Sequence, residues 1–227
     1  MRDTIVTMKH FTAIIILTLI NLKVSGQGHS IGIIGGASSS NVSSKSFPGN
    51  NGSRQAFTGG LTYSYVFKNH FATEVDLISI QRGFTNDALL TDNTGNQVGK
   101  ITSEFNYNYI ALSVKAGYTL GAKLYGFGNV GVIPSMLIKA ETISPKIDGN
   151  GVVTSHETFD ITDQVNKIDI AGLVQIGAGF NFHKNIGLFS TLGYQRSITT
   201  FTSSEYFTNY NIRHNGVSLC LGVKSKL

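Results

Sequence analysis

The sequence contains few of the residues that build disulfides, metal centres or charged soluble surfaces. Its one cysteine, Cys220, excludes a disulfide framework and an all-cysteine metal site. Tryptophan is absent, there are three prolines, and 14% of the 227 residues are charged, compared with ~25% in soluble globular domains. Glycine is abundant instead, at 26 residues, and 41% of the chain is hydrophobic, which excludes a disordered protein. We therefore expect a single folded domain that is poor in charge.

Residues 1–26 have the pattern of a secretory signal peptide. Basic residues precede a twelve-residue apolar run at 11–22, and small residues, Val24 and Gly26, occupy positions −3 and −1 of a cut before Gln27. The run is shorter than the ~20 residues that span a bilayer, so cleavage is expected rather than a retained anchor. No later apolar run is long enough to form another membrane helix. We therefore expect a cleaved signal peptide at 1–26 and one domain at 27–227.

The charge distribution does not favour a nucleic-acid partner. Cleavage before Gln27 leaves 15 basic and 12 acidic residues, a net charge of +3, scattered without a run of one sign. A nucleic-acid-binding surface would require a basic stripe. We therefore expect no nucleic-acid partner. A start of translation at Met8 rather than Met1 would give a more compact signal peptide and the same charge count for the cleaved chain.

Apolar residues alternate with glycine and small polar residues along most of the remaining chain. In 166–182, one face carries isoleucine, valine and phenylalanine, and the other carries polar residues such as Asp169, Gln175 and Asn181. A period of two is typical of β-strands with one apolar face, and 215–227 shows the same pattern. Eight such segments are predicted, at roughly 29–38, 55–67, 71–84, 103–120, 124–138, 166–182, 186–199 and 210–227.

The connections between these segments alternate between short and long. Three short turns are predicted at 68–70, 121–123 and 183–185. Eight antiparallel strands whose two ends lie on one side need three connections on that side and four on the other. Outer-membrane barrels place short turns in the periplasm and long loops outside. We therefore predict an all-β fold: an eight-stranded antiparallel up-and-down transmembrane β-barrel with short periplasmic turns and four long extracellular loops. The predicted long loops are 39–54, 85–102, 139–165 and 200–209.

A soluble barrel of the lipocalin or streptavidin kind is the competing fold, and it would carry a small apolar ligand. Such a barrel turns its apolar face inward and covers its outer face with charged residues. Here the second face is mainly Gly, Ser, Thr, Asn and Gln, which fit the narrow interior of an eight-stranded membrane barrel. Aromatic residues also gather in two groups, near the short turns and near the long loops, as expected for the two belts of a membrane barrel. The second group comprises Phe84, Phe105, Tyr107, Tyr194, Phe201, Tyr206 and Phe207.

Three segments of the chain match the strand patterns of one known family. They are IGIIGGASSSN at Ile31–Asn41, FATEVDLISIQRG at Phe71–Gly83 and YIALSVKAGYTL at Tyr109–Leu120. The chain thereby resembles the PorT-like outer-membrane β-barrel proteins of the Bacteroidota. Members of that family often carry Glu and Pro where this chain has Ala111 and Ser113, and they commonly end in an aromatic residue rather than Leu227. The resemblance implies an outer-membrane location and no agreed activity, and the different last residue implies weaker recognition by the barrel-insertion machinery.

Two charged residues are placed to meet inside the predicted barrel. Asp76 and Lys115 fall on the inward faces of adjacent predicted strands, at the same distance from the short-turn end. We therefore predict an interior salt bridge between them, with a structural role in filling the barrel. Removing one partner of such a buried pair costs roughly 3–5 kcal/mol. The same polar filling is predicted to include Glu74, Arg82, Gln175, Gln195 and Lys224.

A lipid-modifying hydrolase of the outer membrane is the alternative function. It would require a nucleophile and a base within hydrogen-bond reach of each other. His156 falls in the third predicted long loop with Ser155, Glu157 and Asp160, and His214 lies beside the fourth. Residues that are neighbours in the chain rarely orient into a catalytic relay, so we expect solvated loop residues and no enzyme activity.

No cofactor or metal ion is predicted. The six histidines show neither HxH nor HExxH spacing. The glycine-rich segments lack a GxGxxG pattern ahead of a helix, so nucleotide binding is not supported. Cys220 projects inward by alternation and is expected to be a small core residue.

The four long loops are the expected place for specificity, because rigid barrels commonly carry binding in their loops. We therefore expect a non-enzymatic outer-membrane protein with a structural or binding role through these loops, or an accessory role in an envelope complex. A diffusion porin ranks below this, because eight strands leave no water-filled channel. The expected partners are outer-membrane lipid, the barrel-insertion machinery during biogenesis, and an extracellular ligand or envelope protein.

Overall fold

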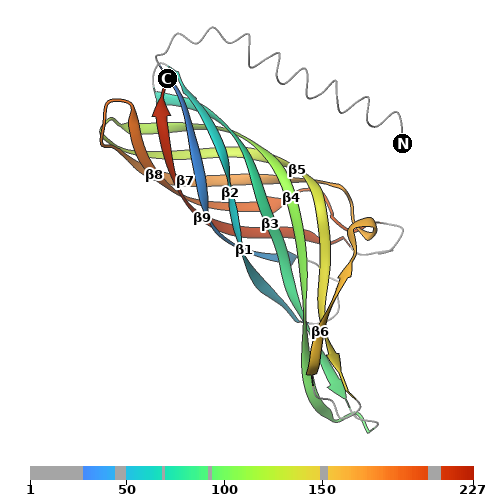
Figure 1. Ribbon diagram of the computed structural model, residues 1–227. Coiled ribbons are helices and arrows are strands. Elements are labelled where there is room, and N and C mark those ends of the chain that lie inside the picture. Colours follow the sequence, from blue (N-terminus) through green and yellow to red (C-terminus); the bar gives the residue numbers. More distant parts are fainter. Residues whose placement is uncertain (1–27, 44–49, 68–69, 92–93, 149–152, 204–210) are drawn as a thin grey trace, which may run out of the picture.

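The computed structural model describes residues 28–43, 50–67, 70–91, 94–148, 153–203 and 211–227. The predicted signal peptide at 1–26 lies outside the described residues. The described chain forms a tilted barrel from which strands project at one end (Figure 1). No helix among the described residues is long and apolar enough to cross a membrane.

In the described part of the chain, nine strands form one antiparallel sheet, and eight of them close into a ring. The strands are β1 (His29–Ser43), β2 (Asn50–Val66), β3 (Phe71–Thr91), β4 (Gln97–Gly121), β5 (Leu124–Ile147), β6 (Val153–Asp160), β7 (Ile168–Asn181), β8 (Ile186–Ser197) and β9 (Arg213–Lys226). Hydrogen-bonded neighbours follow the order β4-β3-β2-β1-β9-β8-β7-β5-β6, and an additional pairing of β4 with β5 closes the ring. The predicted eight-stranded barrel is confirmed, and β6 is a ninth strand attached to β5 outside the ring.

The ring turns apolar side chains outward and polar or small side chains inward. On β9, Leu219 and Leu221 are exposed whereas Cys220 between them is buried. On β7, Ile168 is exposed whereas Asp169 is buried. A lipocalin-like barrel would show the opposite arrangement, so the soluble-carrier alternative is wrong. The exposed apolar band is the surface that a lipid bilayer covers in a membrane barrel.

Both ends of the described chain lie at the end of the barrel that carries the short turns. Ser30 on β1 pairs with Lys226 on β9. β4 passes into β5 at Gly121, whose φ of +98° is in the left-handed region. A Cβ at Gly121 would lie 2.3 Å from the carbonyl oxygen of Leu124, so this turn requires glycine. In outer-membrane barrels the short turns lie on the periplasmic side.

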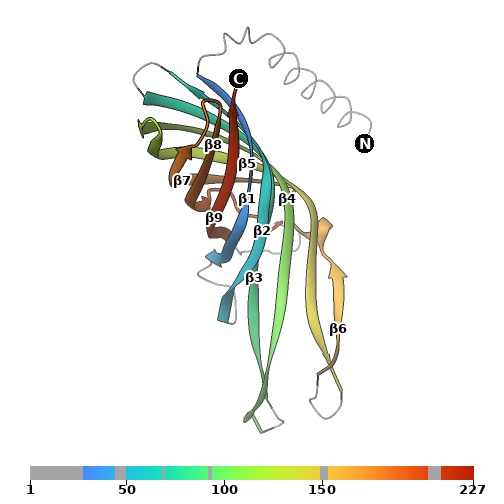
Figure 2. The same ribbon diagram turned by 60° about the vertical axis from the view of Figure 1, so that its left-hand side comes forward.

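Two of the predicted long loops are mainly β-structure. β3 continues to Thr91 and β4 begins at Gln97, so most of 85–102 is a hairpin. β5 continues to Ile147 and is followed by β6, so 139–165 also forms a hairpin, with a 3₁₀ turn after it. These two hairpins project beyond the barrel and splay apart (Figure 2). The sequence did not reveal the strands in these two connections, because polar residues on both faces suggest irregular structure, whereas a strand outside the bilayer needs no apolar face and is held by its backbone hydrogen bonds.

The other two predicted long loops lie partly outside the described residues. Within 39–54, β1 extends to Ser43 and β2 begins at Asn50, so this connection is shorter than predicted. Within 200–209, residues 200–203 carry no strand, and Phe201 is buried inside the barrel.

Candidate functional site

The charged layer nearer the short-turn end contains the two residues predicted to pair. Lys115 Nζ lies 2.6 Å from Asp76 Oδ2, and it also binds the Glu74 carboxylate. Glu74 stands directly opposite Lys115 in the β3–β4 register, whereas Asp76 stands opposite Ser113. Gln175 Oε1 accepts a hydrogen bond from Lys115 Nζ at 3.3 Å. The layer is therefore a three-membered cluster in which two carboxylates share one ammonium. Alternation placed Glu74 on this face but did not reveal that it shares the lysine.

A second charged layer lies further toward the hairpins. Arg82 Nη1 binds Asp169 Oδ2, with side chains 1% and 0% exposed. Ser197 Oγ donates to Asp169 Oδ2 at 2.7 Å, and Thr199 Oγ1 donates to Asp169 Oδ1 at 2.6 Å. Arg82 Nη2 also donates to Gln195 Oε1 at 3.3 Å. Sequence reasoning missed this pair, because β3 and β7 are not neighbours in the sheet and meet only across the closed lumen. The one available signal was that both residues fall on inward faces.

Apolar side chains separate the two charged layers. Ile80 and Ile133 are each 3% exposed, and Leu173 packs against them. A cavity of about 40 Å³ remains between the layers, bordered by Asp76 and Gln195 among others. The described interior is thus filled by its own side chains, as expected for an eight-stranded ring.

An aromatic cluster fills the interior beyond the second charged layer, where sequence reasoning placed an outer belt. Phe84, Tyr107 and Phe201 are at most 2% exposed. His214 stacks on Phe201 with ring centroids 4.1 Å apart and meets Tyr107 edge-on at 5.0 Å. The belt prediction is wrong for these aromatic residues and for Phe105, which stacks on Phe84 inside the barrel. Of the predicted group, Tyr194 is exposed, and Tyr206 and Phe207 lie outside the described residues.

The error in the aromatic belt has a simple geometric cause. Side chains an even number of residues apart on a strand share a face. Phe84 is eight residues from Asp76 on β3, so it points inward with it. Proximity to a strand end suggested an outward-facing belt. Whether an aromatic side chain points into or out of the barrel is instead decided by the alternation of side chains along its strand.

The residues considered for a hydrolytic set are not brought together. On the exposed strand β6, Ser155 and Glu157 lie on one side and His156 on the other, since side chains alternate. Glu157 Oε1 is held 2.6 Å from Lys146 Nζ on β5. His214 is buried among aromatic rings, and neither of its ring nitrogens has a hydrogen-bond partner. Among the described residues, neither histidine forms a hydrogen bond with a serine or a carboxylate.

The projecting hairpins carry exposed ion pairs and a polar groove. Lys100 Nζ on β4 lies 2.7 Å from Asp87 Oδ2 on β3. Hydrogen bonds from Lys100 and from the Thr102 hydroxyl hold the pKa of Asp87 below its usual value. Hydrogen bonds from Thr162 likewise lower the pKa of Asp160 at the end of β6. A groove of about 720 Å³ lies beside this end of β6, lined by Ile138, Lys139, Asp160, Thr162, Asp163 and Gln164.

Three aromatic rings near the short-turn end each cover a glycine on the neighbouring strand. The directly opposed pairs are Tyr125 with Gly179, Phe127 with Gly177, and Phe189 with Gly222. A Cβ on Gly179 would lie 2.2 Å from the Tyr125 hydroxyl oxygen, so the ring takes the space that a side chain would need. The glycines therefore fix the rings in place against the barrel wall.

The Gly179→Val variant is expected to unfold with a free energy about 1–3 kcal/mol lower than the parent, because it overpacks the Tyr125 site. Urea unfolding of the barrel in lipid vesicles, followed by heat-modifiable migration on SDS gels, measures the loss. Gly126→Val is the matched control, since a Cβ there would meet only the Gly177 carbonyl oxygen at 3.8 Å. Equal losses in the two variants would contradict the packing of the ring on Gly179.

Comparison with known proteins finds one family and several solved structures. The family model described as "Outer membrane protein beta-barrel domain" matches residues 25–203. The chain is similar to Ail, the attachment invasion locus protein of Yersinia pestis, with 14% identity, a TM-score of 0.41, and coverage of 87% of this chain and 98% of that chain. It is also similar to Neisserial surface protein A, with 15% identity, a TM-score of 0.43, and coverage of 88% of this chain and 100% of that chain. A third similar structure is the outer membrane protein OprG of Pseudomonas aeruginosa, with 10% identity, a TM-score of 0.45, and coverage of 88% of this chain and 96% of that chain. No curated protein matches the sequence. At these identities and TM-scores, the likeness carries no conclusion about what the chain does.

Proposed function

This chain belongs to the family of outer membrane protein beta-barrel domains, and on that premise we propose that it is a non-enzymatic binding protein of the bacterial outer membrane. The β3–β4 and β5–β6 hairpins hold a ligand or an envelope protein outside the cell. The observation that carries this proposal is the length of the strands. β4 has 25 residues, whereas a strand that only spans a bilayer needs about 9–11. The additional length builds structure outside the membrane.

The outer edge of β6, which pairs with no other strand in the described part of the chain, is the feature of these hairpins best suited to binding. β6 is the last strand in the sheet order and pairs with β5 along one edge. All eight of its residues are exposed. An unpaired edge presents backbone N–H and C=O groups that can take up an extended segment of another protein as an additional strand. The outer edge of β6 therefore suits a protein partner that binds in an extended conformation.

A photoreactive residue at Thr158 of β6 is expected to form a discrete higher-mass adduct in intact cells, because the partner's strand would lie against it. The same group at Ile33, which faces lipid, is the control and should form no protein adduct. The absence of any adduct from β6 would contradict the proposal.

The purified barrel is expected to show no porin-sized conductance in planar bilayers. The Lys115 and Arg82 layers and the aromatic cluster occupy the lumen in succession, and porins with water-filled channels need 16 or more strands. A general diffusion porin reconstituted in parallel is the positive control. A steady conductance of porin size would overturn the proposal that the barrel is closed and acts through its ends.

A lipid-modifying hydrolase has less support from the described residues. His214 is enclosed, and the neighbours of His156 on β6 point to the opposite side of the strand. Lipid hydrolysis by the purified barrel that is lost on His156→Ala or His214→Ala would overturn the non-enzymatic proposal.

We also propose the PorT-like proteins as the finer assignment within the family. The segment Phe71–Gly83, one of the three that carry the resemblance, contains Glu74, Asp76 and Arg82, which contribute to both charged layers. Insertion by the outer-membrane barrel-insertion machinery and an accessory role in an envelope complex are part of this finer proposal.

A further inference from the structure

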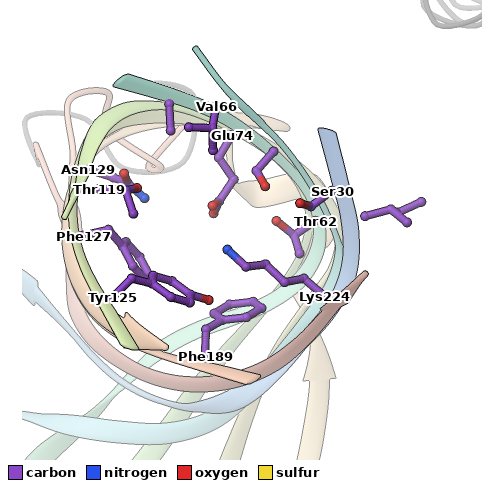
Figure 3. Close-up of a pocket in the computed structure, with 13 residues that line it drawn as sticks. Ser30, Thr62, Val66, Glu74, Thr119, Tyr125, Phe127, Asn129, Phe189 and Lys224 are labelled. Atoms are coloured by element: carbon purple, nitrogen blue, oxygen red, sulfur yellow. The ribbon is translucent and has the colours of Figure 1, made fainter. Parts of the chain in front are cut away.

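The short-turn end of the barrel is hollowed into a cup that the hairpin function does not use (Figure 3). A cavity of about 330 Å³ opens there, with a narrower one of about 30 Å³ beside it. The two cavities are adjacent, since they share lining residues. The shared residues are Ser30, Val66, Thr119, Tyr125 and Lys224, and we call the combined space the cup.

The ammonium of Lys224 projects from β9 into the cup (Figure 3). Its Nζ lies 4.4 Å from the centroid of the Tyr125 ring and 5.9 Å from that of Phe189. Among the described residues, no carboxylate lies within 4.0 Å of this ammonium. Glu74 faces the same space but is bound by Lys115. The cup therefore holds a cation without a direct counter-ion in the described part of the chain.

Two buried hydroxyl groups beside this cation also lack partners. Tyr125 and Thr62 are each 5% exposed, and both line the inner part of the cup. The Tyr125 hydroxyl and Thr62 Oγ1 have no hydrogen-bond partner. Buried hydroxyls in folded proteins are normally satisfied. Thr62 stands opposite Asp76, whose Oδ1 is also a buried atom without a partner. The Tyr125 hydroxyl next to the ammonium has no such neighbour in the register, so it points to an acceptor from outside the barrel.

The charges around the cup are predominantly positive. The two carboxylates of this end among the described residues are Glu74 and Asp76, and both are held by Lys115. Lysines on the strand ends and turns add positive charge at the rim, and one of them, Lys226, lines the cup itself. Lys123 and Lys184 lie in the turns at this end and do not line the cup, and the Lys123 ammonium lies 5.5 Å from the centroid of the exposed Phe180 ring.

We propose that the cup binds a phosphate group at the periplasmic face of the membrane. Lys224 supplies the opposite charge, and the hydroxyls of Tyr125 and Thr62 donate hydrogen bonds. These groups come from three strands, β9, β5 and β2, and they converge on one space. A phosphate group is anionic at neutral pH and offers several strong acceptor oxygens, so it can accept from all three donors together. A soluble phosphate ester and the headgroup of an anionic phospholipid share this chemistry.

Calorimetric titration of the folded barrel with inorganic phosphate, in a phosphate-free alkyl glucoside detergent, tests the site. Saturable binding is expected, at least ten-fold weaker in Lys224→Met. Tyr125→Phe keeps the ring over Gly179 and removes only the hydroxyl, so a loss of several-fold is expected. Lys100→Met, on the far hairpin, is the matched control and should bind as the parent does. Each variant is checked for folding by its heat-shifted migration, and Tyr125→Phe carries the test if Lys224→Met does not fold.

Competition then distinguishes the two sources of phosphate. Displacement by glycerol 3-phosphate as strongly as by short-chain phosphatidylglycerol supports the site with a soluble ester as its ligand. Displacement by phosphatidylglycerol alone supports it with a lipid headgroup as its ligand. The absence of saturable phosphate binding, or equal binding by the parent, Lys224→Met and Tyr125→Phe, overturns the proposal. None of these results depends on whether the hairpins bind a partner.

Discussion

The Arg82→Met variant is expected to unfold with a free energy roughly 3–5 kcal/mol lower than the parent barrel. The change leaves the Asp169 carboxylate, whose side chain is 0% exposed, without its cation. Ser197 and Thr199 still donate to Asp169, but two neutral hydroxyls do not replace a guanidinium in a site closed to water. Urea unfolding in lipid vesicles, read from the heat-modifiable band on SDS gels, gives the difference.

A double variant distinguishes the loss of the Arg82–Asp169 ion pair from a general sensitivity of the barrel interior to substitution. Arg82→Met/Asp169→Asn removes both charges, so it is expected to lose less than Arg82→Met alone. Lys100→Met, which breaks the exposed pair with Asp87, is the control and should leave the free energy of unfolding nearly unchanged. Losses that simply add in the double variant would show that Arg82 and Asp169 are not coupled.

The Lys115→Met variant is expected to lose a similar free energy, roughly 3–5 kcal/mol, because two carboxylates lose their shared ammonium. Asp76 and Glu74 then stand on one face of β3, two residues apart, with like charges and little water. The same unfolding assay measures this loss. Lys139→Met is the control, since its pair with Glu141 is exposed on the outer part of β5.

The three-membered cluster predicts a graded rescue. Asp76→Asn/Lys115→Met should recover part of the loss, because Glu74 stays charged. Glu74→Gln/Asp76→Asn/Lys115→Met should recover more, since no unpaired carboxylate remains in the layer. Full recovery by the double variant would show that Glu74 has no part in the cluster, and additive losses would contradict the pairing altogether.

The filled interior of the barrel provides rigidity, and its two ends are the places suited to binding. Two charged layers, an apolar layer and an aromatic cluster lock the eight strands together. Such a barrel is a rigid support, and binding belongs where the strands leave the membrane. We propose that the hairpins serve this purpose at one end and the Lys224 cup at the other.

The ring of strands was predictable because membrane strands obey a period of two. Ile168, Ile170 and Val174 must meet lipid, so Asp169 and Gln175 between them must face inward, and the sequence shows this directly. The Asp76–Lys115 contact could also be predicted from this alternation, since it joins adjacent strands. Glu74 satisfies the same parity and lies opposite Lys115, but alternation alone does not tell which of two carboxylates binds a lysine.

The sequence alone determined the strand number of the ring, the outward apolar face and the polar interior, because each follows from local periodicity and from the spacing of turns. Only the tertiary structure decided which inward residues meet. Arg82 and Asp169 lie on strands that are not neighbours, and closure of the ring brings them together. The same holds for Lys224 and Tyr125 in the cup, where the positions depend on barrel curvature and on a glycine opposite the ring. The hairpins beyond the membrane also required the structure, because strands without an apolar face have no periodic signal in the sequence.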